Sequence, residues 1–89
     1  MQTVAGLDTH KDSVFLCILQ ANGEKREKKY GVLTSELTML REELVRHQVS
    51  EVGMESTSIY WIPIWRVLEG YAKQYLVNPY FRSMGQIAG

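Results

Sequence analysis

The order of apolar and helical segments predicts an α/β fold built on one mixed five-stranded sheet. Two apolar runs open the chain, an Asn-Gly pair turns the second run back, and two helical patterns are each followed by a further apolar run. A three-strand antiparallel meander and two right-handed crossovers place the strands in the order 3-2-1-4-5, with the third strand at an edge. Both crossovers run the same way across the sheet, so the helices are expected mainly on one face.

Residues 2–7 predict the first strand, which Asp8 follows directly. A turn-opening role for Asp8 is the alternative, because Asp side chains often bond the backbone that follows them. Residues 13–20 predict the second strand, whose six successive apolar positions, 14–19, indicate that both faces need cover. The single cysteine, Cys17, lies in this run and is interpreted as a small buried hydrophobic residue without an internal disulfide partner.

Asn22 and Gly23 predict a type I′ hairpin turn, in which both residues have positive φ. The returning third strand is expected over residues 24–32. It is rich in charge, which is typical of an edge strand protected against pairing with other chains. We prefer this explanation of the basic cluster to a DNA-binding patch.

Thr34 and Ser35 are predicted to cap the first helix, with Glu36 in the first turn, where the helix dipole favours an anion. The helix is expected to end near His47, which is interpreted as a surface residue without chemistry. The predicted core face of this helix consists of Leu37, Leu40, Leu44 and Val45.

Residues 49–54 predict the fourth strand, which Glu55 follows directly. Because proline is best tolerated at the first helical position, Pro63 predicts a second helix that begins near residue 62. Gly70 is expected to end it in a left-handed conformation. Residues 73–77 predict the fifth strand, and a third helix is expected to begin within residues 80–87. Three aromatic residues are expected to pack in the core and on the helix rather than to stack on DNA bases: Tyr60, Trp61 and Trp65.

Eighty-nine residues permit one small domain with a thin core. A composition of 45% hydrophobic and 22% charged residues excludes a disordered chain. No apolar run is long enough to cross a bilayer and no secretory leader opens the sequence, so we expect a cytoplasmic protein without membrane contact. Ten basic residues balance ten acidic residues, and His10 and His47 lack zinc-site spacing, so neither net charge nor histidine content indicates a function.

Two predicted strands are each followed by an acid, Asp8 and Glu55. In the predicted strand order these strands are parallel neighbours about 4.8 Å apart, so the two carboxylates meet at one edge of the sheet. Such pairs can share cations in two-metal phosphoryl-transfer sites. Mg²⁺ suits them because it binds a few carboxylates together with phosphate oxygens. The predicted strand order thus allows Asp8 and Glu55 to share a divalent cation such as Mg²⁺ or Mn²⁺.

In this strand order, three short segments give the chain a resemblance to a known family. They are Asp8 with His10 and Lys11, Glu55 with Ser56, Thr57, Tyr60 and Trp61, and Val77 with Asn78 and Pro79. The chain thereby resembles the DEDD-type insertion-sequence transposases, which are related to the Piv DNA invertase. Their amino-terminal domain has the RuvC-like fold of the RNase H-like superfamily. One departure is Ser58, where the family pattern has glycine.

The resemblance implies that residues 1–89 are the amino-terminal part of an RNase H-like transposase domain that acts on DNA phosphodiesters. Asp8 and Glu55 would be the first two acids of a tetrad that binds Mg²⁺, and His10 and Lys11 could contact DNA phosphate. The remaining two acids would follow Gly89, so these 89 residues are expected to be inactive alone and to bind the metal weakly. The implied partners of the parent protein are DNA and, in some members, a guide RNA.

Two other functions stay open. Sugar-kinase, Hsp70 and actin ATPases share the meander and the strand-end aspartate, but their phosphate-binding turn needs glycines, and residues 9–13 contain none. The second alternative is an association module without catalysis, because one sheet face lacks helices while the second strand is apolar on both faces. This homo-oligomer would bury either Val14, Leu16 and Ile18 or the alternate set Phe15, Cys17 and Leu19.

Overall fold

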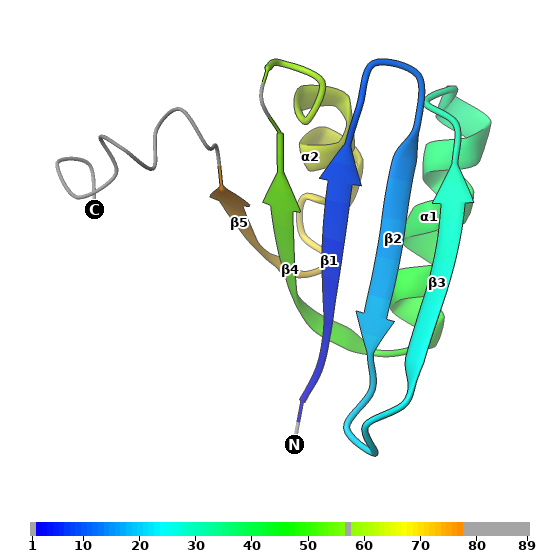
Figure 1. The fold of residues 1–89 in the computed structure, drawn as a ribbon, viewed down its shortest axis with the longest axis vertical. Helices are drawn as coiled ribbons and strands as arrows, with labels where there is room; N and C mark the ends of the chain where they lie inside the picture. Colours follow the sequence, from blue (N-terminus) through cyan, green and yellow to red (C-terminus); the bar gives the residue numbers. More distant parts are fainter. Residues whose placement is uncertain (1, 57, 78–89) are drawn as a thin grey trace, which may run out of the picture.

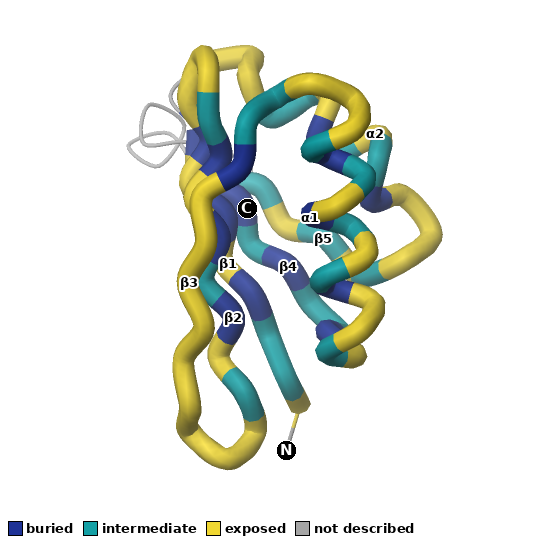
Figure 2. The backbone as a smooth tube through the Cα atoms, turned by 90° about the vertical axis from the view of Figure 1, so that its right-hand side faces the viewer, coloured by how far each residue is buried: buried dark blue, intermediate teal, exposed yellow. Residues whose placement is uncertain are grey.

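The computed structural model describes residues 2–56 and 58–77, which form one sheet with two helices on one of its faces (Figures 1 and 2). The strands run in the order β3-β2-β1-β4-β5, with β1 antiparallel to β2 and parallel to β4. The predicted strand order is therefore confirmed, including the edge position of the third strand. The elements are β1 (Thr3–Thr9), β2 (Val14–Leu19), β3 (Lys25–Tyr30), α1 (Thr34–Arg46), β4 (Val49–Glu55), α2 (Ile62–Leu68) and β5 (Lys73–Val77).

The core lies between the sheet and the two helices, as Figure 2 shows. Alternate residues of the central strands enter it, and the side chains between them point to the open face, by which we mean the sheet face opposite α1 and α2. Val14, Leu16 and Ile18 of β2 are buried in this core, whereas Phe15 and Leu19 are exposed on the open face. Cys17 also lies on the open face and is only partly buried, so its interpretation as a buried residue was wrong.

The predicted third helix at residues 80–87 lies outside the described residues. No helix among residues 2–56 and 58–77 is long and apolar enough to cross a membrane.

The first strand is longer than predicted, because β1 continues through Asp8 to Thr9. A charged residue ends a strand that is buried on both faces, but here one face is open to solvent and the Asp8 side chain points there. The neighbouring strand shows the same effect, since β4 includes Glu55. Because the open face is exposed to solvent, Asp8 is part of β1 and Glu55 is part of β4, although each acid was expected to follow its strand.

The turn between β2 and β3 is not the predicted type I′ turn. Gly23 has a φ of 92°, but Asn22 does not have positive φ. Its side chain instead accepts a hydrogen bond from the Glu24 N–H at 2.9 Å, while the Gly23 N–H bonds the Gln20 carbonyl at 2.9 Å. A loop with one left-handed glycine at its end thus replaces the two-residue turn.

Helix α1 begins without the predicted side-chain caps. Leu33 is its N-cap residue, and no side chain caps it, so the capping roles expected for Thr34 and Ser35 were wrong. Glu36 in the first turn reaches back instead and accepts a hydrogen bond from the Gly31 N–H at 2.8 Å. A Cβ at Gly31 would collide with this carboxylate, so the glycine makes room for the contact.

The predicted core face of α1 is confirmed for its three leucines, which are all buried. Val45, however, is 51% exposed, because it lies on the solvent side of the helix next to the buried Leu44. The start of α2 at Ile62, its Pro63 in the first turn and the positive φ of 83° at Gly70 are as predicted. Trp61 and Trp65 pack edge to face with ring centroids 5.7 Å apart and lie against the core, whereas Tyr60 is 38% exposed.

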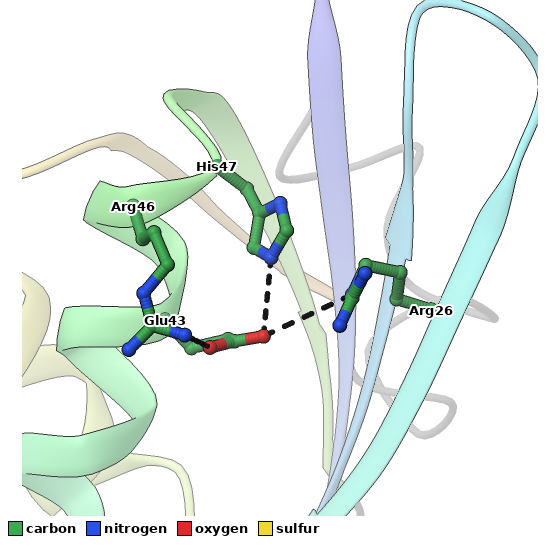
Figure 3. Close-up of polar contacts among 4 residues, drawn as sticks. All are labelled: Arg26, Glu43, Arg46 and His47. Atoms are coloured by element: carbon green, nitrogen blue, oxygen red, sulfur yellow. Dashed lines mark hydrogen bonds and ion pairs between the residues drawn. The ribbon is translucent and has the colours of Figure 1, made fainter.

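Glu43 joins the end of α1 to the edge strand β3 (Figure 3). Its carboxylate lies 2.7 Å from Arg46 Nη1 and 3.1 Å from His47 Nε2, and Arg26 Nε of β3 lies 4.0 Å away. The His47 side chain is only 18% exposed. Its expected surface position was therefore wrong, because Glu43 one turn earlier draws the ring inward.

The pH dependence of folding provides a test of the Tyr30 environment. Burial, with a smaller contribution from the Glu43 carboxylate and opposed by Arg46, raises the pKa of the Tyr30 phenol above its ordinary value of 10.0. A folded-state pKa above the unfolded one stabilises the protein below the unfolded pKa, and this stabilisation is lost as the pH rises through the folded pKa.

Tyr30→Phe should therefore gain stability relative to the parent chain as the pH rises above about 10, as measured by urea unfolding. Glu43→Gln, which removes one charge that raises the pKa, should make the alkaline loss of stability smaller, because it brings the folded-state pKa of Tyr30 closer to the unfolded value. A difference between Tyr30→Phe and the parent chain that stays constant with pH would contradict this account.

Candidate functional site

Asp8 and Glu55 are register partners on the neighbouring parallel strands β1 and β4. Register partners on adjacent strands direct their side chains to the same sheet face, so both carboxylates lie on the open face near the carboxyl ends of the strands. Both residues are exposed, and the Asp8 side chain retains 60% of its accessible surface. The structure thus brings together the two acids that the sequence analysis singled out.

Two hydrogen bonds fix the strand ends that carry these acids. The Thr9 hydroxyl donates to the Glu55 carbonyl at 3.2 Å, which ties the end of β1 to the end of β4. The Ser56 N–H donates to the Val77 carbonyl at 3.2 Å, which ties β4 to β5. Thr9 is 4% exposed and Ser56 is 2% exposed. Buried polar side chains of this kind hold the backbone under the carboxylates in one position.

The Ser56 hydroxyl also orders the start of the following loop. It donates to the Ser58 carbonyl at 3.1 Å and accepts from the Ser58 N–H at 3.3 Å. Ser58, which departs from the resembled pattern, therefore takes part in a local turn beside Glu55.

A shallow hollow of about 370 Å³ lies on the open face beside the two carboxylates. Gly6 and Gly53, which are register partners on β1 and β4, form its floor, and a Cβ at either position would meet no atom within 4 Å. Phe15 and Cys17 of β2 line one side, and Val77 of β5 lines the other. The missing side chains leave space next to the acids that a ligand can enter.

The two polar residues after β1 differ in their contacts. His10 Nε2 lies 3.2 Å from Asp8 Oδ2, although both side chains are 60% exposed. The His10 N–H also donates to the Ser13 carbonyl at 2.8 Å and closes the turn. Lys11 is exposed and lines a separate apolar pocket on the helix side of the sheet. The structure therefore places His10, but not Lys11, beside the carboxylates.

The sequence analysis overlooked the two glycines, although a signal for them was present. Gly6 and Gly53 each precede the acid of their strand by two residues, as Gly-Leu-Asp and Gly-Met-Glu. In a strand, residues two apart share a face, so each glycine lies on the face of its acid. Because this spacing occurs in two neighbouring parallel strands, it would have predicted that the two glycines lie side by side next to the acids and form the floor of the hollow.

The site offers two carboxylates as ligands for Mg²⁺. Asp8 and Glu55 offer hard oxygen ligands, and Mg²⁺ is commonly bound through one or two carboxylates while it keeps several waters or substrate phosphate oxygens. The hollow beside the carboxylates has room for such additional ligands. Within residues 2–56 and 58–77, no group of three or more His, Cys, Asp or Glu side chains is placed to hold a metal ion. The described residues therefore fit a weak, partly hydrated Mg²⁺ site with two protein ligands.

Fold and site together define a small α/β domain with paired carboxylates at the ends of two central parallel strands. No protein-family model matches the chain, and no curated protein matches its sequence. The assignment of a function therefore rests on the residues of the site.

Proposed function

We propose that this chain is the amino-terminal part of the RNase H-like catalytic domain of a DEDD-type, Mg²⁺-dependent DNA transposase or recombinase. The observation that carries the proposal is the register pairing of Asp8 with Glu55 on adjacent parallel strands. Active sites of open α/β sheets lie at the carboxyl ends of such strands. The sheet order and the segments that resemble this family support the same assignment.

In this function Asp8 and Glu55 hold a divalent cation at the edge of the open face. The bound cation would polarise a DNA phosphodiester and stabilise the charge that develops on its oxygens. His10, which pairs with Asp8, keeps that carboxylate oriented and presents a ring nitrogen near DNA phosphate. Lys11 adds positive charge farther along the turn. The other two acids of the tetrad would come from residues after Gly89, as would contacts with a guide RNA where one is used.

Paramagnetic broadening by Mn²⁺ tests the metal site in the 89-residue chain. We expect the amide signals of Asp8, Glu55 and their neighbours along β1 and β4 to broaden first, because the paramagnetic relaxation falls steeply with distance from the ion. Mg²⁺ at higher concentration should reverse the effect, since it competes for the same hard oxygen ligands.

Glu51→Gln supplies the matched control. Glu51 lies on β4 and points to the same face as Glu55, but four residues earlier, at a distance of about 13 Å along the strand. The variant should bind Mn²⁺ like the parent chain. Broadening that is spread evenly over all surface carboxylates, or centred away from Asp8 and Glu55, would refute the metal site.

A further inference from the structure

The open face carries a regular pattern of charge that follows from the sheet register. The side chains form three rows across the sheet, each containing one residue from every strand. From β3 to β5, the rows are Lys25, Leu19, Val4, Glu51 and Lys73; Glu27, Cys17, Gly6, Gly53 and Tyr75; and Lys29, Phe15, Asp8, Glu55 and Val77. On β1 and β2 these side chains are apolar or small except for Asp8, and charged residues flank them on β3 and, in the first and third rows, on β4.

The open-face residues of β3 and β4 are complementary in charge. In the first row Lys25 stands on β3 and Glu51 on β4, and in the third row Lys29 stands on β3 and Glu55 on β4. Within each row two strands separate the opposite charges, a spacing of roughly 14 Å. Within residues 2–56 and 58–77, none of these four side chains forms an ion pair. Among the described residues, each of these charges is therefore without an ion-pair partner.

We propose that the open face binds the open face of a second copy of this chain. The two copies are related by a twofold axis that runs parallel to the strands between β1 and β2. This operation keeps every row in place and lays β3 of one copy over β4 of the other. Lys25 then faces Glu51 of the second copy, and Lys29 faces Glu55 of the second copy. Because a twofold interface repeats each contact, four ion pairs form.

The centre of this interface is apolar and fits in shape. β2 of one copy lies over β1 of the other, so Leu19 meets Val4 and Cys17 meets the empty space above Gly6. Leu19 is 43% exposed in the single chain and Phe15 is 45% exposed. Phe15 covers the hollow beside Asp8, the one place where an apolar side chain meets an acid. Removal of these side chains from water supplies the attraction, and the ion pairs fix the register.

The size of the overlap predicts a weak dimer. Four strands spaced by about 4.8 Å, with some six residues each, give a patch of roughly 400 Å² on each copy. Stable interfaces bury about 800 Å² on each partner, so this dimer belongs among weak associations. It is expected to form without metal. Because it pairs Glu55 and covers the hollow beside Asp8, the dimer competes with the proposed metal site for the same face.

Sedimentation velocity of the metal-free chain up to about 1 mM is the first measurement. We expect the weight-average mass to rise toward that of a dimer over this range. A single species with the mass of one chain at the highest concentration would overturn the proposal.

A charge-exchange experiment tests the register. One variant carries Lys25→Glu with Lys29→Glu, and the other carries Glu51→Lys with Glu55→Lys. Alone, each variant places like charges opposite one another and should dimerise at least about tenfold more weakly than the parent chain. Mixed together, the two variants restore all four ion pairs as a heterodimer, which should form at least about tenfold more tightly than either homodimer.

The control for this experiment combines Lys11→Glu with Arg66→Glu, which makes the same change in net charge as the β3 variant but away from the open face. It should dimerise like the parent chain. Equal weakening by this control, or mixing without heterodimer formation, would overturn the proposed register. Because each chain has a single cysteine on the open face, a short bismaleimide should also link Cys17 to Cys17 in the parent dimer, a test that needs no charge variant.

Discussion

Asp8→Asn should weaken selective Mn²⁺ binding at the strand ends at least about tenfold while leaving the fold intact. The amide removes one of two carboxylate ligands, and a cation that loses half of its protein ligands and their charge should bind at least tenfold more weakly, or about 1.4 kcal/mol. Glu55→Gln should have the same effect, because the two acids are register partners. Mn²⁺ titration followed by amide line broadening measures both losses.

The stability of the same variants provides an independent signature of the site. Two like charges on neighbouring strands repel each other, so the removal of one should leave the free energy of unfolding unchanged or raise it by a few tenths of a kcal/mol. If the two acids stabilised the fold, the removal of one would instead lower the free energy of unfolding. A loss of more than about 1 kcal/mol in urea unfolding of Asp8→Asn would show that the carboxylate is structural.

Leu40→Ala should destabilise the chain by about 2 to 5 kcal/mol. Leu40 is fully buried on the core face of α1, between the sheet and the helix layer. A domain of this length has a total stability of roughly 4 to 13 kcal/mol, so the substitution can remove half of it. Thermal and urea unfolding followed by circular dichroism would measure the loss.

Met39→Ala is the matched control for Leu40→Ala. Met39 precedes Leu40 in the same helix but is 51% exposed, so its truncation leaves no cavity. Its expected effect is within about 0.5 kcal/mol, because alanine is also a better helix former. Comparable losses at the two positions would mean that α1 does not pack on the sheet as described.

The strand order and the pairing of Asp8 with Glu55 could be predicted from sequence because they depend on connectivity. A hairpin and two crossovers of fixed handedness allow few arrangements, and one of them makes these acids neighbours. Which set of β2 residues enters the core could not be predicted. An unbroken apolar run has no period, so only the packing of the helices distinguished Val14 from Phe15.

Three local predictions were wrong, and in two of them a side chain forms a contact that the sequence does not reveal. His47 turned inward because Glu43 lies one helical turn before it. Thr34 does not cap α1, because the helix begins one residue earlier than predicted, with Leu33 as its N-cap. Asn22 kept negative φ because its side chain bonds the Glu24 N–H. For His47 and Asn22, a single short contact outweighed a general preference of about 1 kcal/mol.

The helices on one face divide the positions of β1, β2 and β4 into two groups that can evolve separately. Residues that face α1 and α2 are constrained by the volume of the core, whereas their neighbours on the open face contribute little to it. A library selected for folding alone should therefore drift at every second position of these strands. The residues at those positions include two glycines and the paired acids. Their identity should therefore depend on binding at this surface, and they can be substituted without loss of folding stability.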